Sequence, residues 1–233
     1  MNPKRYILII DDESQDTQKL VLEKRLKSSF NVVCKTLRTK DNVFKKEENG
    51  EDVLDIDKLT KKLEELFKGN SFDLVLTDYN LSEKLVNGLD IVKIIKDRWA
   101  RTNIIMYSGK LPDIVRNMIR VDEDEKLSDK QVIEAVSKLV KYRIIAFPER
   151  TRYVDEAYDF LIQNKELSLT NELVRLLRQH NDLEFKSCFP EFAGKTFGEI
   201  ADLIDNKADQ RSDEWIKSIL EQTIAYLVKA NNE

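Results

Sequence analysis

The sequence is poor in cysteine, histidine and long apolar runs. Its two cysteines, Cys34 and Cys188, lie far apart, and Cys34 falls in an apolar segment, so we expect reduced thiols and no disulfide framework. No apolar run approaches the ~20 residues of a membrane span, and no secretory leader precedes the first expected strand. We therefore expect a cytoplasmic protein that does not associate with a membrane.

Positive charge is not in excess either. The chain carries 39 Lys and Arg against 43 Asp and Glu, a formal net charge of −4, and from residue 165 onward the count is 9 against 13. A DNA-binding output domain needs a basic recognition helix, and Arg175 and Arg178 are interpreted as solvent charges, so no binding to nucleic acid is expected. The single histidine, His180, lacks the neighbours of a phosphotransfer histidine and is interpreted as a surface residue.

What is present is an alternation of apolar runs with amphipathic segments. The runs expected to be strands are 6–10, 30–37, 72–77, 103–107 and 143–147. This alternation predicts a doubly wound α/β fold, with helices on both faces of a five-stranded parallel sheet. We expect this domain to span residues 1–164, with inserted helices at about 111–141 and an all-helical extension over 165–233. The polar residues 39–54 are interpreted as a loop insertion.

Three carboxylates lie at the ends of two expected strands. Asp11 and Asp12 directly follow the first strand, and Asp78 follows the third. Because the carboxyl ends of parallel strands share one edge of a sheet, these acids should repel one another until one is protonated or a cation binds. Oxygen ligands around a small open site suit Mg²⁺. The alternative is that they only terminate strands or cap helices. Side chains of residues 11, 12 and 78 that point apart, or a salt bridge filling the gap between them, would overturn the metal site and any function that depends on it.

Four segments of the chain resemble the receiver domain of two-component response regulators. They are Ile9–Glu13, Leu76–Asn80, Asn87–Val92 and Ile104–Gly109. The resemblance covers roughly residues 4–110 and extends less closely to about residue 164. It implies the flavodoxin-like fold of that family and a place in phosphoryl signalling.

The resemblance also implies roles for individual residues. Asp78 would accept a phosphoryl group from a histidine kinase or a phosphotransfer protein. Asp11, Asp12 and Asp78, with the backbone carbonyl of Asn80, would hold Mg²⁺. The hydroxyl group of Ser108 would contact the phosphoryl oxygens.

The chain departs from the family where a Lys-Pro pair normally follows the last strand. Phe147-Pro148 stands there, so an aromatic ring replaces the lysine that contacts the phosphoryl group. Lys110, two residues past Ser108, is the best substitute, and Arg150 is a weaker one. The switch aromatic of the family would fall at Ile144, so any output is expected to use the inserted helices.

Three functions are compatible with these residues. The first is an atypical response regulator, a phospho-acceptor and not a turnover enzyme, that acts through protein contacts or as a phosphate sink or relay; homodimerisation through an exposed helical face is left open. The second is a pseudo-receiver that binds partners without phosphorylation, which the missing lysine favours. The third is an aspartyl-phosphate hydrolase of the haloacid dehalogenase type. Asp78-Tyr79-Asn80 loosely resembles the nucleophile motif of that family, but the motif normally follows the first strand and here it follows the third, so this function ranks last.

Overall fold

The computed structural model describes residues 2–48, 50–68, 71–81, 86–110, 128–164, 169–186, 189–205 and 210–232. The expected helix over 112–120 and Cys188 lie outside the described residues. The second expected inserted helix is present as α5 (Asp129–Lys141). Within the described part of the chain, no helix has the length and apolar character needed to cross a membrane.

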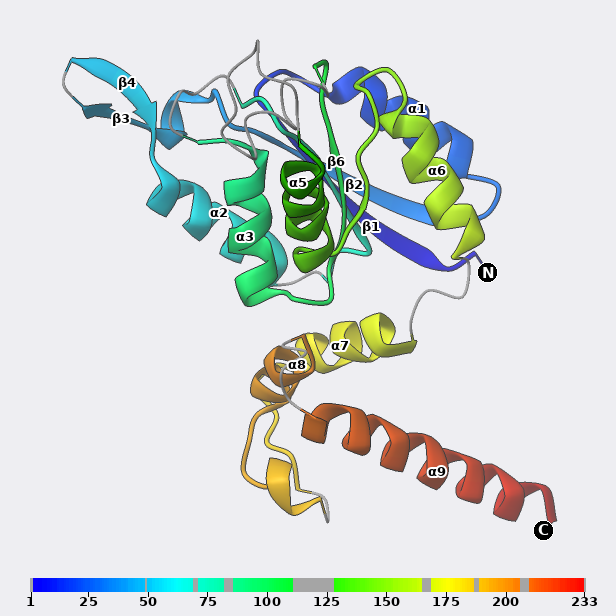
Figure 1. Cartoon of the computed structure of the whole chain (residues 1–233). Helices are drawn as coiled ribbons and strands as arrows, with labels where there is room; N and C mark the ends of the chain where they lie inside the picture. Colours follow the sequence, from blue (N-terminus) through cyan, green and yellow to red (C-terminus); the bar gives the residue numbers. More distant parts are fainter. Residues whose placement is uncertain are drawn as a thin grey trace.

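Five parallel strands form the central sheet (Figure 1). They are β1 (Lys4–Asp11), β2 (Asn31–Arg38), β5 (Leu74–Asp78), β6 (Asn103–Tyr107) and β7 (Ile144–Ala146). Their order across the sheet is β2-β1-β5-β6-β7, with every neighbouring pair parallel. Counted along the chain, this is the 2-1-3-4-5 order of the flavodoxin-like doubly wound fold. The predicted fold class is therefore confirmed.

Two hydrophobic cores, one on each face of the sheet, explain why these segments form strands. Side chains alternate along β1, so Leu8 and Ile10 lie in one core while Ile7 and Ile9 lie in the other. Burial on both faces makes the central strands continuous apolar runs. The helices that contribute to the first core are α2 (Ile56–Lys68), α3 (Gly88–Arg98) and α5, and those that contribute to the second are α1 (Asp16–Leu26) and α6 (Tyr153–Gln163).

The interpretation of residues 39–54 as a loop was wrong. A short 3₁₀ helix, η1 (Asn42–Phe44), leads into an antiparallel hairpin of β3 (Lys45–Glu48) and β4 (Glu51–Leu54), which projects from the body of the molecule in Figure 1. The sequence between these strands is Asn-Gly, which is a strong signal for a hairpin turn. Gly50 has a φ of 81°, a left-handed conformation that glycine adopts without steric cost. The surrounding run of charges concealed this signal.

The C-terminal part of the described chain is helical, as predicted. It contains α7 (Leu169–Gln179), the 3₁₀ helix η2 (Pro190–Phe192), α8 (Phe197–Asp205) and α9 (Gln210–Asn232). These elements share a third hydrophobic core around Val174, Phe192, Ile204 and Trp215. This separate core explains how a small helical unit is stabilised beside the α/β domain.

Helix α7 contacts the α/β domain at the edge of the sheet where β5 begins. Asp73, the fully buried residue before β5, accepts hydrogen bonds from the backbone N–H of Tyr6 (2.8 Å) and the side chain of Asn171 (3.2 Å), and the Arg175 guanidinium lies 3.6 Å from its carboxylate. Arg5 is also buried beside them. We call Arg5, Asp73, Asn171 and Arg175 the docking cluster.

A second arginine of α7 strengthens the same contact. Arg178 donates to the backbone carbonyl of Phe67, at the end of α2 (2.8 Å), and pairs with the buried Asp205 of α8 (2.6 Å). Both arginines are thus buried ion-pair partners, and their interpretation as solvent charges was wrong. The prediction failed because their acidic partners lie far away in the sequence.

Candidate functional site

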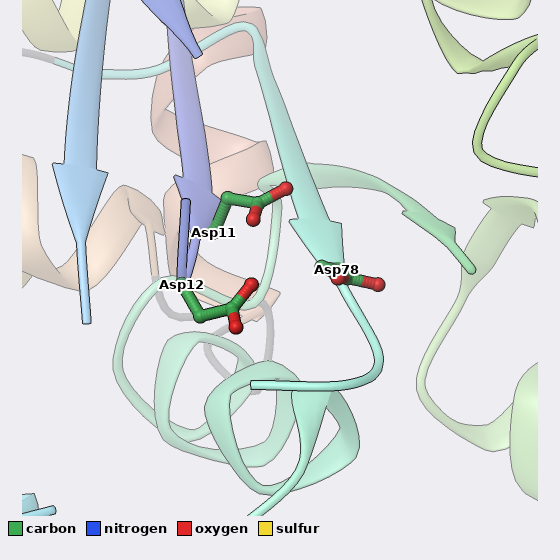
Figure 2. Close-up of side chains that lie close together, drawn as sticks. All are labelled: Asp11, Asp12 and Asp78. Carbon is green, nitrogen blue, oxygen red and sulfur yellow. The ribbon is translucent and has the colours of Figure 1, made fainter. Parts of the chain in front are cut away.

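Three aspartates converge at the carboxyl edge of the sheet. Asp11 ends β1, Asp12 follows it, and Asp78 ends the adjacent strand β5 (Figure 2). Each offers a carboxylate oxygen, and these oxygens all lie within 4.8 Å of one another. All three residues are buried. We call them the acid cluster.

Burial and mutual repulsion make ionisation of the acid cluster costly. Burial, followed by the charge of Asp11, raises the pKa of Asp78 to about 7. Burial also raises the pKa of Asp11, against the opposing effect of hydrogen bonds from Tyr107, Glu13 and Arg150. Near neutral pH, a positive charge placed between these carboxylates therefore stabilises their ionised forms.

Arg150 supplies positive charge at this position. Its Nη2 lies 2.7 and 2.8 Å from the two carboxylate oxygens of Asp11 and 3.3 Å from Oδ2 of Asp78. Burial lowers the pKa of Arg150, but the neighbouring Asp11 and Asp78 outweigh this effect and raise it above its already high value. On the other side, the Lys40 ammonium lies 2.6 Å from Oδ2 of Asp12. The structure therefore contains the salt bridge that was expected to count against a metal site.

The register of the last strand explains how Arg150 reaches the acids. The pairing of β7 with β6 shifts between Ile104 and Ile105, and beyond Pro148 it resumes as a bridge between Ser108 and Glu149. The backbone N–H of Arg150 donates to the carbonyl of Ser108 (2.8 Å). The residues level with Ser108 are therefore those after Pro148, whereas Phe147 packs against the first core. Aligning Phe147-Pro148 with the Lys-Pro pair of the family therefore placed the expected cation at residue 147, before its actual position at Arg150.

Lys110, the substitute preferred from the sequence, has a different position. Its side chain is exposed, and it contributes to the site through its backbone N–H, which donates to the Ser108 hydroxyl (3.1 Å). Ser108 also accepts from the side-chain amide of Asn80 (3.1 Å), and the backbone N–H of Asn80 donates to Asp78 (3.2 Å). Ser108 and Asn80 thus lie next to the acid cluster, and the ion-pair geometry ranks Arg150 above Lys110.

Two buried tyrosines at the site were missed from the sequence. The hydroxyl of Tyr107 donates to Oδ2 of Asp11 (2.6 Å), and its ring stacks on that of Tyr153 with centroids 3.9 Å apart. The Tyr153 hydroxyl in turn donates to the side-chain oxygen of Gln15 (2.6 Å). The position of Tyr107 immediately before Ser108 was the only available signal, since Tyr153 is distant in sequence.

Gly88 supports the backbone that carries Asp78. It begins α3, where the side chain of Asn87 caps the helix, and a Cβ atom on Gly88 would lie 2.3 Å from the carbonyl oxygen of Asp78. Only glycine permits this close approach of the helix to the end of β5. Gly88 therefore keeps the start of α3 in close contact with the end of β5.

The residues present fit a hard divalent cation. The donors of the acid cluster are all oxygens, as Mg²⁺ requires, and three buried carboxylates exceed the charge that the single central arginine neutralises. Asp11, Asp12 and Asp78 are the side chains that would hold it.

Solved structures of receiver domains are similar to this chain at low sequence identity and low TM-score. The isolated REC domain of RcsB from Salmonella enterica serovar Typhimurium in the apo form matches with a TM-score of 0.41 and 14% identity, over 70% of this chain and 88% of that one. A response regulator receiver domain protein from Clostridium thermocellum gives 0.38 and 19%, over 70% and 98%. A response regulator from Thermotoga maritima gives 0.37 and 13%, over 71% and 99%.

Because these TM-scores lie below 0.5, the fold assignment rests on the strand order of the sheet and not on these likenesses. The sequence matches no protein-family model and no curated protein. The functional argument therefore rests on the residues at the edge of the sheet.

Proposed function

We propose that this protein is an atypical response regulator in which Asp78 accepts a phosphoryl group from a histidine kinase or a phosphotransfer protein. The observation that carries the proposal is the convergence of three buried carboxylates at the carboxyl edge of a flavodoxin-like sheet. Ligands and chemistry in open α/β sheets lie at this edge. The raised pKa values at this site also mark a candidate functional centre.

The proposed reaction is a simple displacement. An oxygen of Asp78 attacks phosphorus, the bond from phosphorus to the imidazole nitrogen of the partner breaks, and the electron pair of that bond stays on the imidazole. The product is an acyl phosphate on Asp78. Mg²⁺, when bound, supplies charge neutralisation for the phosphoryl oxygens.

The other residues of the site have supporting roles in this proposal. Asp11, Asp12 and the backbone carbonyl of Asn80 complete the Mg²⁺ site with Asp78. The buried Ser108 hydroxyl orients a phosphoryl oxygen, and Arg150, in place of the lysine of the family, supplies positive charge.

We also propose that output goes through protein contacts or phosphate storage, and not through DNA. The exposed face of α5 presents Ile133 and Val140, which suits a protein partner or a second copy of this chain. The net charge of −4 gives no electrostatic attraction to nucleic acid. In this proposal the protein works in the cytoplasm and has no substrate turnover beyond its own phosphorylation and dephosphorylation.

One observation favours a second candidate, a pseudo-receiver that binds partners without phosphorylation. Arg150 and Lys40 already neutralise much of the acid cluster, so the site is stable without a metal ion. In this alternative the cluster is a structural ion-pair network, and partner binding is independent of phosphate.

Labelling with a small phosphodonor separates these candidates. The full chain is incubated with acetyl phosphate, with and without Mg²⁺, and phosphoprotein is measured for wild type, Asp78→Ala and the surface control Asp155→Ala. We expect Mg²⁺-dependent labelling of wild type and of Asp155→Ala and none of Asp78→Ala. Folded wild type that stays unlabelled would support the pseudo-receiver, and multiple turnovers on phosphomonoesters would support a hydrolase.

A further inference from the structure

We propose that Arg150 is a built-in counter-ion of the acid cluster, which a divalent cation has to displace before it can bind. The inference rests on the proposed function, because it concerns the regulation of the same site. A permanent salt bridge would count against a metal site. In this proposal the salt bridge is instead the metal-free state, in which Arg150 occupies the place that a divalent cation takes in the other state.

The hydrogen bonds of Asp11 show why the two cations exclude each other. Oδ1 accepts from the backbone N–H of Glu13 (2.9 Å) and from Arg150 (2.7 Å), and Oδ2 accepts from the Tyr107 hydroxyl (2.6 Å) and from Arg150 (2.8 Å). Each oxygen thus uses two acceptor positions, and Arg150 occupies one on each. When Arg150 leaves, both positions become free while Glu13 and Tyr107 still hold the carboxylate in place.

The position of Arg150 beside Asp78 also excludes simultaneous binding of a divalent cation. The Arg150 guanidinium is within ion-pair distance of Asp11 and Asp78 at once, so it lies between ligand atoms that are themselves only 4.8 Å apart or less. A divalent ion that binds these oxygens needs that space and brings positive charge next to the guanidinium. Steric overlap and repulsion both act against simultaneous occupancy.

The structure also provides a route for Arg150 to leave. Its backbone is fixed by the hydrogen bond to Ser108, but its side chain is 34% exposed. The carboxylate of Glu13, which is exposed at the rim of the site, already lies 3.7 Å from the guanidinium. A change of side-chain rotamer therefore moves the charge to Glu13 without moving the sheet. In the proposed function, the released guanidinium then pairs with a phosphoryl group on Asp78.

The test compares Mg²⁺ binding by wild type, Arg150→Gln and the matched control Arg152→Gln, using titration calorimetry at constant ionic strength. Arg152 lies two residues away and pairs with Glu156 of its own helix, so this control changes the net charge equally and leaves the site intact. We expect Arg150→Gln to bind Mg²⁺ about tenfold more tightly than wild type, with Arg152→Gln unchanged.

The other outcomes are equally informative. Equal or weaker binding by Arg150→Gln, or equal tightening in both variants, would overturn the counter-ion role while leaving the metal site standing. If wild type and both variants bind no Mg²⁺, the inference and the metal-dependent part of the proposed function fail together. Should Arg150→Gln be unfolded without metal, added Mg²⁺ has to restore its folding, measured by circular dichroism, and failure to do so refutes the exchange.

Discussion

The acid cluster and the docking cluster lie at opposite ends of the same strand, β5, and they contain buried charge in opposite proportions. At the carboxyl end, three aspartates share one central arginine and a lysine at the edge. At the other end, one aspartate, Asp73, is surrounded by two buried arginines and an asparagine. The first arrangement has acid in excess, and the second has base in excess.

The difference shows what each cluster contributes. In the docking cluster, burial also raises the pKa of Asp73, but α7 covers this carboxylate and gives it Asn171 and Arg175 as partners. In the acid cluster, the raised pKa of Asp78 means that its charge is held at a cost in stability. A cost of burying an aspartate is therefore common to both ends, and the difference lies in the surroundings. Asp73 is enclosed by α7, whereas Asp78 lies among like charges at the edge where open α/β sheets bind their ligands. The comparison supports the proposed chemistry at one end of β5 and indicates assembly at the other.

The largest expected effect comes from removing the centre of the docking cluster. Asp73→Ala deprives Tyr6 and Asn171 of their buried acceptor and leaves Arg175 with Glu172 alone, so we expect a loss of about 3–5 kcal/mol in the free energy of unfolding. Urea denaturation followed by circular dichroism measures it. Asp155→Ala, which removes an exposed partner of Arg25, should cost less than about 1 kcal/mol. Similar losses in both variants would contradict the structural role of Asp73.

Replacing Asp78 by alanine, at the other end of β5, should raise the free energy of unfolding instead of lowering it. Asp78 has a pKa of about 7 in the folded chain, well above its ordinary value, so the unfolded chain releases this proton first as pH rises. Stability falls between about pH 4 and pH 7 for this reason. We expect Asp78→Ala to gain about 2 kcal/mol at pH 8, and none of this gain at pH 4.

Urea denaturation of wild type and Asp78→Ala at a series of pH values measures that difference. A gain that is independent of pH would mean that repacking, and not the cost of ionisation, accounts for it. If Asp78→Ala is less stable than wild type at pH 8, Asp78 is a structural acid like Asp73, and the contrast between the two clusters disappears.

The smallest expected change in stability comes from removing a hydrogen-bond donor to the carboxylate of Asp11. Tyr107→Phe removes one donor to Asp11, and we expect a loss of about 1 kcal/mol in stability, together with weaker Mg²⁺ binding in calorimetry. Tyr153→Phe is the matched control, because its hydroxyl donates to Gln15 and lies beside that of Tyr107 instead of donating to Asp11. It should cost a similar stability and leave Mg²⁺ binding unchanged. Equal effects on binding would show that the stacked rings, and not the hydroxyl of Tyr107, position the carboxylate.

The fold and the acids were predictable from the sequence because both depend on local patterns. Continuous apolar runs such as Leu74–Thr77 mark buried strands, and parallel strands bring their carboxyl ends to one edge, so Asp11 and Asp78 could be placed together before any coordinates. The hairpin at 45–54 was also predictable from its Asn-Gly turn, had the charges around it been given less weight.

The cations of both clusters were harder to place, since Arg150 was named only as the weaker substitute and Arg175 was interpreted as a solvent charge. Arg150 reaches the acids because of a register shift in the last strand, which no local pattern reveals. Arg175 pairs with Asp73 across about a hundred residues of sequence, and an amphipathic helix alone does not show which of its charges are buried. Such contacts depend on tertiary packing, which local sequence reasoning does not capture.

The five-residue length of β5 restricts which insertions and deletions the chain can tolerate. At about 3.3 Å per residue, the residues Asp73 and Asp78 are ~17 Å apart along the strand. One residue more or less would turn every following side chain to the opposite face, so one of the two aspartates would lose its partners. Changes in chain length are therefore excluded from this strand, whereas the turn of the projecting hairpin, at Gly50, is suited to accept an inserted epitope or fluorescent label.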